Sequence, residues 1–251
     1  TFRDFRHIRE PQLLETRHLL LNQRRPPSIK LPAPLDLPDK LFPIDPYALG
    51  VWLGDGTSTS GYITCGDEDV NHFKTLGKVH QPPNRTSWLV LIPGVAKATK
   101  FLNLRKNKHI PPQYLLGSIS QRLALLQGLM DTDGYIDMTG KCEFSVTSER
   151  LARDTYSLIA SLGLKCSMNE SGAYLKGRYI SQRYRLVFYP AKMNVFRLAR
   201  KLQRQINTKS RQVNNLYIKA IEPVSPRDMQ CIEVEGGLYL AGAGFIPTHN
   251  S

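Results

Sequence analysis

The sequence of 251 residues has few cysteines and no long apolar run. Its four cysteines stand far apart and form no Cys-x-x-Cys pair, which disfavours a structural zinc site and a disulfide framework and suits a reducing cytosol. No apolar run approaches the roughly 18 residues that a membrane-spanning helix needs, and we expect no signal peptide. We therefore expect a cytoplasmic protein without a membrane partner.

Negative charge is also scarce. Lys and Arg outnumber Asp and Glu by 34 to 21, which gives a formal net charge of +13. Such an excess can serve solubility alone. In a basic domain of this size it more often indicates a polyanionic partner, and nucleic acid is the first candidate.

Three regions differ in character along the chain. Residues 1–45 are basic and proline-rich, and they predict a linker or the end of a preceding domain. Residues 46–211 contain an approximate repeat, in which "PYALGVWLGDGT" and "LALLQGLMDTDGYID" are each followed by strand, helix and strand patterns. Two copies indicate a pseudo-twofold α+β domain and not a solenoid. Residues 212–251 combine short β-branched runs with Gly-rich turns, which predict a small β unit.

The two apolar runs at the start of each repeat have small residues at helical spacing. Gly50 and Gly54 are four apart on one run, and Gly128 and Thr132 are four apart on the other. Residues four apart share one face of a helix, so small side chains there let two backbones approach closely. We expect the two helices to pack against each other along these faces.

Each of these runs ends in Asp-Gly. Gly56 and Gly134 suit a left-handed cap at the end of a helix. Asp55 and Asp133 would then lie side by side at the negative ends of two packed helices, which is unfavourable unless a cation binds between them. Mg²⁺ prefers such oxygen ligands. Because Asp-Gly is also an ordinary turn dipeptide, these residues alone leave a metal site and a pair of structural turns equally open.

The two runs resemble the paired motifs of LAGLIDADG homing endonucleases. "LQGLMDTDG" (126–134) matches the second motif closely, whereas "ALGVWLGDG" (48–56) has Leu53 where the pattern usually has an acid. The resemblance implies an αββαββα repeat whose sheets form a saddle in the major groove of double-stranded DNA. It also implies that Asp55 and Asp133 bind Mg²⁺ or another divalent ion and catalyse DNA cleavage.

The same resemblance implies a basic residue near the centre of each repeat. "KNKHIP" (106–111) resembles the Lys-x-Ile-Pro element before the second motif and points to Lys108. "NTKSRQ" (207–212) offers Lys209, although one of several solvated cations is an equally good interpretation of that residue. Such a cation would polarise solvent or offset charge near the scissile phosphate. Phosphate contacts are expected from Arg183, Arg185, Arg197, Arg200 and Lys201.

The last residues, "THNS", allow peptide-bond chemistry. The Asn250 amide can attack its own carbonyl carbon and break the following peptide bond. The His249 imidazole can polarise that carbonyl or protonate the leaving amine. The Ser251 hydroxyl can accept an acyl group as an ester. The tripeptide His-Asn-Ser is weak evidence alone, because it occurs often by chance.

Residues 216–251 resemble the C-terminal splicing region of an intein, a β-rich Hint-type segment. Cys231 stands where most inteins have an acid, and Thr248 precedes His249. Both features resemble class 3 inteins, which are typical of replicative DNA helicases of the DnaB type. That resemblance implies that Cys231 is the first nucleophile, Ser251 the second and Asn250 the cyclising residue, with no cofactor. Leu238 stands where many inteins have a helper His, and no N-terminal splicing block is visible.

Together these features favour an intein: a splicing segment that carries a DNA endonuclease, with the flanking host segments (exteins) of a replicative helicase as partners. We expect a monomer. One alternative is a DNA-binding LAGLIDADG protein, or a degenerate intein, that no longer cleaves DNA. A free-standing endonuclease or RNA maturase is the third hypothesis, which Cys231 and the "THN" ending disfavour.

Overall fold

The computed structural model describes residues 13–15, 19, 27–208, 215–226, 228, 230 and 232–249. It is a mixed α+β structure, as the sequence predicts. Within these residues, no helix is both long enough and apolar enough to cross a bilayer.

The first repeat begins with a helix that carries the first Asp-Gly. Its elements in chain order are α1 (Pro46–Asp55), β2 (Tyr62–Cys65), α2 (Val70–Phe73), the 3-10 helix η2 (Lys74–Leu76), β3 (Lys78–His80), β4 (Trp88–Leu91) and α3 (Val95–Phe101). A short helix, α4 (Pro112–Leu115), follows it.

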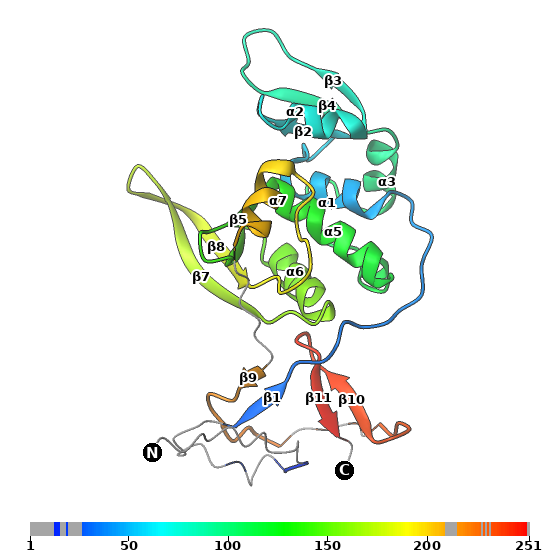
Figure 1. The fold of residues 1–251 in the computed structure, drawn as a ribbon, viewed down its shortest axis with the longest axis vertical. Coiled ribbons are helices and arrows are strands. Elements are labelled where there is room, and N and C mark those ends of the chain that lie inside the picture. The colour runs from blue at the N-terminus through cyan, green and yellow to red at the C-terminus, as the bar shows by residue number, and fades with distance from the viewer. Residues whose placement is uncertain are drawn as a thin grey trace.

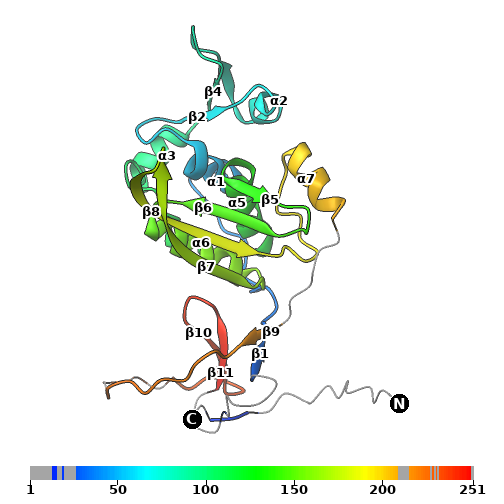
Figure 2. The ribbon, with the colours of Figure 1, turned by 90° about the vertical axis from the view of Figure 1, so that its left-hand side faces the viewer.

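The second repeat has the same order of elements, with longer strands. They are α5 (Ile119–Thr132), β5 (Gly134–Ile136), β6 (Cys142–Val146), α6 (Glu149–Ser161), β7 (Cys166–Leu175), β8 (Arg178–Phe188) and α7 (Ala199–Ile206). Figure 2 shows its sheet in front of the helices α5 and α6.

The two sheets have equivalent antiparallel topologies. The second sheet has the strand order β5-β6-β8-β7. The first has the order β2-β4-β3, and an isolated bridge between Gly56 and Ile63 stands where β5 pairs with β6 in the second. Counting that bridge as a strand, both halves follow the order αββαββα.

Local sequence explains where the two long motif helices begin. At α1, the Asp45 side chain accepts a hydrogen bond from the amide of Ala48 (3.0 Å), and Pro46 occupies the first helical position, where no amide donor is needed. At α5, Ser118 and Gln121 form a capping box: each side chain bonds the other's backbone amide. These caps fix the register of both helices and therefore the place of the aspartates at their ends.

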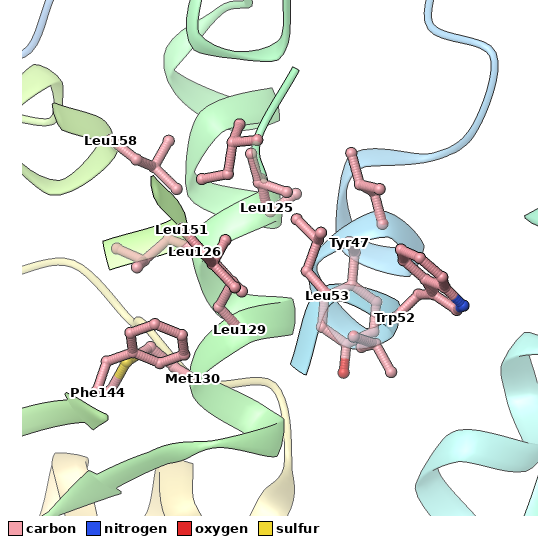
Figure 3. Packing of buried hydrophobic residues seen from close by; sticks show 14 of the residues in the cluster. Tyr47, Trp52, Leu53, Leu125, Leu126, Leu129, Met130, Phe144, Leu151 and Leu158 are labelled. Carbon is pink, nitrogen blue, oxygen red and sulfur yellow. The ribbon is translucent and has the colours of Figure 1, made fainter. Parts of the chain in front are cut away.

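The part of the core drawn in Figure 3 lies between α1, α5, α6 and the second sheet, and the core continues into the first repeat through Ile63, Phe73, Val90 and Val95. Apolar side chains of α1 and α5 face each other there, and α5 also meets side chains from α6 and β6. Since these side chains are almost fully withdrawn from water, each contributes on the order of 1.5–3 kcal/mol to folding. The labelled ones are Tyr47, Trp52, Leu53, Leu125, Leu126, Leu129, Met130, Phe144, Leu151 and Leu158.

The helices α1 and α5 approach through their glycines, as the spacing of small residues predicts. A Cβ added at Gly50 would lie 3.0 Å from the Cα of Gly128 and would overlap the carbonyl oxygen of Leu125. One added at Gly128 would lie 2.6 Å from the amide nitrogen of Val51. Backbone therefore contacts backbone, and no larger residue fits without moving a helix.

The expected left-handed caps at Gly56 and Gly134 are wrong. Gly56 is extended, with φ −72° and ψ 142°, and Gly134 is the first residue of β5. The reason for each glycine is space: a Cβ at Gly56 would overlap the Trp52 carbonyl, and one at Gly134 would overlap the Met130 carbonyl. After each helix the chain runs close against the last helical turn before it enters the next strand, and only glycine fits there.

Part of the proline-rich segment packs against the second repeat. Leu35 donates its amide to the Ser161 carbonyl (2.9 Å), and its own carbonyl accepts from Arg122. Arg122 is fully buried and also donates to the carbonyls of Gly117 (2.9 Å) and Ser161 (2.6 Å). This arginine therefore joins the segment, α5 and α6 through hydrogen bonds to backbone carbonyls.

Four short strands lie together below the helices (Figure 1). β1 (Ser28–Lys30) pairs with β9 (Asn215–Tyr217), and β10 (Leu238–Ala241) pairs with β11 (Ile246–His249), both antiparallel. The predicted β unit is thus built from both ends of the described chain. The division into regions 1–45, 46–211 and 212–251 stays a prediction.

Candidate active site at the ends of two helices

Asp55 is the last residue of α1, and Asp133 follows directly after α5. The close glycine contact brings the two helix ends together: a Cβ on Gly54 would lie 3.3 Å from an Asp133 carboxylate oxygen. Both aspartates remain exposed to solvent as residues, although protein atoms crowd their carboxyl groups. An ion or a phosphate from solution can therefore reach them.

The surroundings disfavour the charged form of both carboxyl groups. Loss of water around Asp55 and the charge of Asp133 together raise its pKa to about 6, against the opposing charges of Lys108 and Lys201. Loss of water also raises the pKa of Asp133, while Lys108 and Lys201 act against that rise. Two adjacent carboxyl groups with raised pKa values are the arrangement that a bound cation stabilises.

Lys108 lies at the end of α1, as expected for a central basic residue. Its ammonium donates to the Gly54 carbonyl (2.8 Å) and stands 5.3 Å from the centre of the buried Trp52 ring. Burial lowers its pKa, while the charges of Asp133 and Asp55 oppose that change. The residue thus places a cation beside both acids.

Lys201 holds the corresponding position at the end of α5. Its ammonium donates to the carbonyls of Met130 (2.9 Å), Asp131 (2.8 Å), Thr132 (3.0 Å) and Gly134 (2.7 Å). The side chain is buried, and the loss of water lowers its pKa to about 8, with the charge of Arg200 acting in the same direction. The expected phosphate contact of Lys201 does not fit this position, because its ammonium is already used inside the protein to cap the helix.

The sequence offered Lys209 for the central basic residue of the second repeat, with a solvated cation as an equally good interpretation, and Lys209 lies outside the described residues. A signal for Lys201 was present in the sequence. Leu198, Lys201, Leu202 and Gln205 follow the spacing of one helical face, and the lysine and glutamine stand there at positions that usually carry apolar residues. Both are buried in the structure.

Asp131 is a further buried acid that the sequence reasoning missed. Its carboxylate accepts from the Tyr47 hydroxyl (2.7 Å) and from the amides of Arg197 (3.1 Å) and Leu198 (3.0 Å). His72 lies 2.7 Å from the same hydroxyl. The carboxylate thereby joins α1 to the start of α7, and α7 carries Lys201 to the end of α5.

The expected phosphate-contacting arginines lie on two elements. Arg183 and Arg185 are on β8; the first donates to Ser171, and the second forms a paired contact with Glu143 at 2.8 and 2.5 Å. The other two are exposed near α7. Arg197 lies over the Tyr47 ring at 4.3 Å, and Arg200 forms a paired contact with Asp69 at 2.8 and 2.7 Å.

The residues expected to take part in splicing are separate from this site in the chain. Thr248 and His249 lie on β11; the Thr248 hydroxyl donates to the Ile246 carbonyl (3.0 Å), and His249 stands opposite Leu238 in the register with β10. Their role in splicing stays a prediction. Cys231, Asn250 and Ser251 lie outside the described residues.

The oxygen donors at the helix ends suit a hard divalent cation. No group of three or more His, Cys, Asp or Glu side chains forms a metal cluster in the part of the chain that the structure describes. The pair Asp55 and Asp133 is nevertheless sufficient for Mg²⁺, which commonly keeps several waters and binds one or two carboxylates together with substrate phosphate. Their raised pKa values fit this assignment.

The second repeat is similar to a known family of domains. Residues 120–212 match the model of the LAGLIDADG-like domain, which therefore begins in α5 and ends after α7; α1 lies outside the match. A solved structure of an I-DmoI variant, described as in complex with its nicked target DNA and in the presence of Mn, matches 65% of this chain and 93% of its own. Its TM-score is 0.39, with 16% sequence identity.

Two curated helicases are also similar in sequence. The replicative DNA helicase DnaB of Mycobacterium intracellulare is 36% identical over 222 residues, which cover 86% of this chain and 37% of the helicase. The ATP-dependent DNA helicase Hel308 of Thermococcus kodakarensis is 28% identical over 159 residues, 49% of this chain and 13% of that protein. This chain thus spans about a third of the first relative and about an eighth of the second. From α5 to the end of α7, the chain is similar to the LAGLIDADG-like domain family.

Proposed function

We propose that residues 46–211 form a homing endonuclease that cuts both strands of a specific DNA site. The observation that supports this most is the pair Asp55 and Asp133. These acids sit at the ends of two helices in backbone contact, are open to solvent, and have raised pKa values. Placing two acids side by side costs free energy, and two ordinary turns would not need acids at these positions, so the pair favours a metal site over structural turns.

Asp55 and Asp133 would hold Mg²⁺ or another divalent ion between them. When bound, the ion supplies an activated water and stabilises the leaving oxygen of the phosphodiester. Two lysines of the protein complete the proposed site. Lys108 brings positive charge close to the scissile phosphate, and Lys201 fixes the end of α5 so that Asp133 keeps its position.

DNA is the substrate that the charge and the sheets favour. The net charge of +13 favours a polyanion, and Arg183, Arg185, Arg197 and Arg200 offer phosphate or base contacts on the exposed surface. Because one chain supplies both aspartates, we propose a monomer. The cytoplasmic location expected from the sequence stays a prediction.

The test of cleavage uses a plasmid that carries a replicative helicase gene without the inserted segment. We expect linear product with Mg²⁺, none with EDTA, and none from Asp133→Asn or Asp55→Asn. Asp39→Asn, which changes an exposed acid in the proline-rich segment, is the control and should cut normally. Equal cutting by Asp133→Asn would refute the site. DNA that is bound but never cut would support the alternative of a binding protein without cleavage.

Protein splicing is the second function that we propose, with the exteins of a DnaB-type helicase as the host. It is supported by the similarity to a replicative helicase over 86% of this chain, and by the β unit that joins β1 to β9. Cys231 would attack the upstream carbonyl and form a thioester. The Ser251 hydroxyl would then take the acyl group as an ester and set the Cys231 thiol free. Cyclisation of Asn250 would break the Asn250–Ser251 peptide bond, with Thr248 and His249 beside that bond. The freed Ser251 amine would then take the acyl group from its own hydroxyl and form the peptide bond between the host segments.

Splicing can be tested by supplying an N-terminal splicing half, joined to its host segment, together with this chain. We expect ligated host product by mass spectrometry, and none from Cys231→Ala or Asn250→Ala. Cys65→Ala removes a cysteine of the first sheet, and this control should still give product. Unchanged ligation in Cys231→Ala would eliminate the class 3 mechanism but would leave the endonuclease proposal standing.

A further inference from the structure

The two sheets differ greatly in the length of their strands. In the first sheet, β2, β4 and β3 have 4, 4 and 3 residues. In the second sheet, β7 and β8 have 10 and 11 residues and form a hairpin that extends well past the helices (Figure 1). The pseudo-twofold relation therefore holds for the order of the elements and not for the size of the surfaces.

Alternation along β8 shows which face of the second sheet is free. Tyr184, Leu186 and Phe188 are buried, so Arg183 and Arg185 between them point away from the core. Their cross-strand partners share that outward face. It carries Tyr135, Glu143, Ser145, Asn169, Ser171, Arg183 and Arg185.

The free face of the first sheet is chemically poorer. Ile63 and Val90 are buried, so their neighbours Thr64 and Leu89 face outward, as does Leu91. Two leucines stand where the second sheet has arginines. The same face also carries Tyr62, Lys78 and His80. Its groups that can bond the edge of a base are therefore fewer than those of the second sheet, and they lie on shorter strands.

On the second sheet, polar side chains hold one another in position. Both guanidinium donors of Arg185 bond the two oxygens of Glu143, at 2.8 and 2.5 Å, and Arg183 bonds the Ser171 hydroxyl. An arginine held as a planar fork suits the two acceptors of guanine, and a glutamate suits the amino group of cytosine. Pre-ordering reduces the entropy that these side chains lose on binding.

Strand length translates into a length of DNA. At about 3.3 Å per residue, β8 spans roughly 36 Å, whereas β4 spans about 13 Å. With base pairs about 3.4 Å apart, these strands can follow at most about ten and four base pairs. The tip of the long hairpin adds exposed Tyr174 and Tyr179, together with Lys176 and Arg178, farther along the duplex.

We infer that the protein reads its DNA unequally: the half-site over β5–β8 carries most of the sequence specificity, and the half-site over β2–β4 is short and permissive. This inference rests on the proposed endonuclease function. It adds that Asn169, Arg183 and Arg185 determine specificity on the long side, while cleavage itself depends on acids contributed by both halves.

The test is a selection of duplexes with 30 random base pairs by the full chain carrying Asp133→Asn, followed by sequencing. We expect one constrained block of about eight to ten base pairs and a second of about four or fewer, following from the strand lengths above. A repeat of the selection with Arg185→Lys keeps the charge but removes the fork. It should lower preference by roughly tenfold or more at one or two positions of the long block, with overall affinity nearly kept.

Thr64→Ala is the matched change on the first sheet and should affect only the short block. Two blocks of equal length, or an Arg185→Lys effect confined to the short block, would overturn the inference and leave the endonuclease proposal intact. Failure to enrich any duplex would instead overturn DNA recognition and both proposals with it. Unchanged urea midpoints in the two variants separate an effect on recognition from an effect on folding.

Discussion

The contact between α1 and α5 can be tested with one methyl group. In Gly128→Ala the new Cβ would lie 2.6 Å from the Val51 amide nitrogen and 2.9 Å from the Gly50 carbonyl carbon, and it would overlap the Tyr47 carbonyl. Relaxed contacts between such atoms begin near about 3.5 Å, so the helices must separate by close to 1 Å. Since the interface is backbone on both sides, no side chain can rotate away.

The expected loss of stability follows from that separation. Overpacking of this kind costs about 1–3 kcal/mol and sometimes more, and the better helix propensity of alanine returns about 0.5–1 kcal/mol. Because no side chain can give way, we take the upper end of the cost and expect a net loss of about 2 kcal/mol. With a urea m-value of about 2 kcal/mol/M, the midpoint should fall by about 1 M.

The assay is urea unfolding of the wild type, Gly128→Ala and Gly66→Ala. Gly66 has no atom within 4 Å of an added Cβ and has an ordinary φ, so its replacement should change stability by no more than about 1 kcal/mol, in either direction. Adding Gly50→Ala to Gly128→Ala should cost less than the sum of the two, because the first change already parts the helices. A midpoint for Gly128→Ala within error of the wild type would refute the close approach.

Three further predictions concern charged groups. Lys201→Met leaves four carbonyls without their ammonium donor, so we expect the free energy of unfolding in urea to fall by about 2–4 kcal/mol. The control Lys192→Met, at an exposed lysine, should lose almost nothing, and equal midpoints for the two variants would contradict the capping role. The pKa of Asp55 rises from 3.8 to about 6 on folding, so the folded state binds more protons, and the free energy of unfolding without metal should fall as pH rises from about 4 to 6. The same pH series of unfolding measurements on Asp55→Asn should be flatter. An equally steep series would show that the sign or the residue is wrong. Arg122→Met removes the donors to Leu35, Gly117 and Ser161, which should cost about 3–5 kcal/mol and speed proteolysis between residues 31 and 45; intact protection of that segment would argue against its docking.

The repeat and its helix pair could be predicted because their signals are local. Gly50 and Gly128 stand at helical spacing within apolar runs, and Asp55 and Asp133 follow in the same short windows. Gly56 misled the prediction for the same reason: Asp-Gly is common in turns, and only the packing of Trp52 against this glycine shows that lack of space, and not a left-handed backbone, selects it.

What could not be predicted depends on segments far apart in sequence. Lys201 caps α5 only because α7 folds back across the helix end, and Asp131 fixes that fold-back from α5 through the amides of Arg197 and Leu198. A buried lysine on an amphipathic helix gives a hint, but its partners are backbone carbonyls, which have no sequence signature. The difference in strand length between the two sheets could not be predicted either, because a strand pattern in the sequence does not show how far two strands remain paired.

The pairing of β1 with β9 has a consequence for how this molecule could have been assembled. Lys30 stands opposite Asn215 in that ladder, so the chain that makes the two repeats leaves the small β unit and returns to it at neighbouring points. A unit whose entry and exit are adjacent can be placed within a surface loop of another protein without straining it. The same geometry allows its removal: a short turn from Lys30 to Asn215 would spare the ladder, so the chain between these two residues could be gained or lost in evolution as one unit.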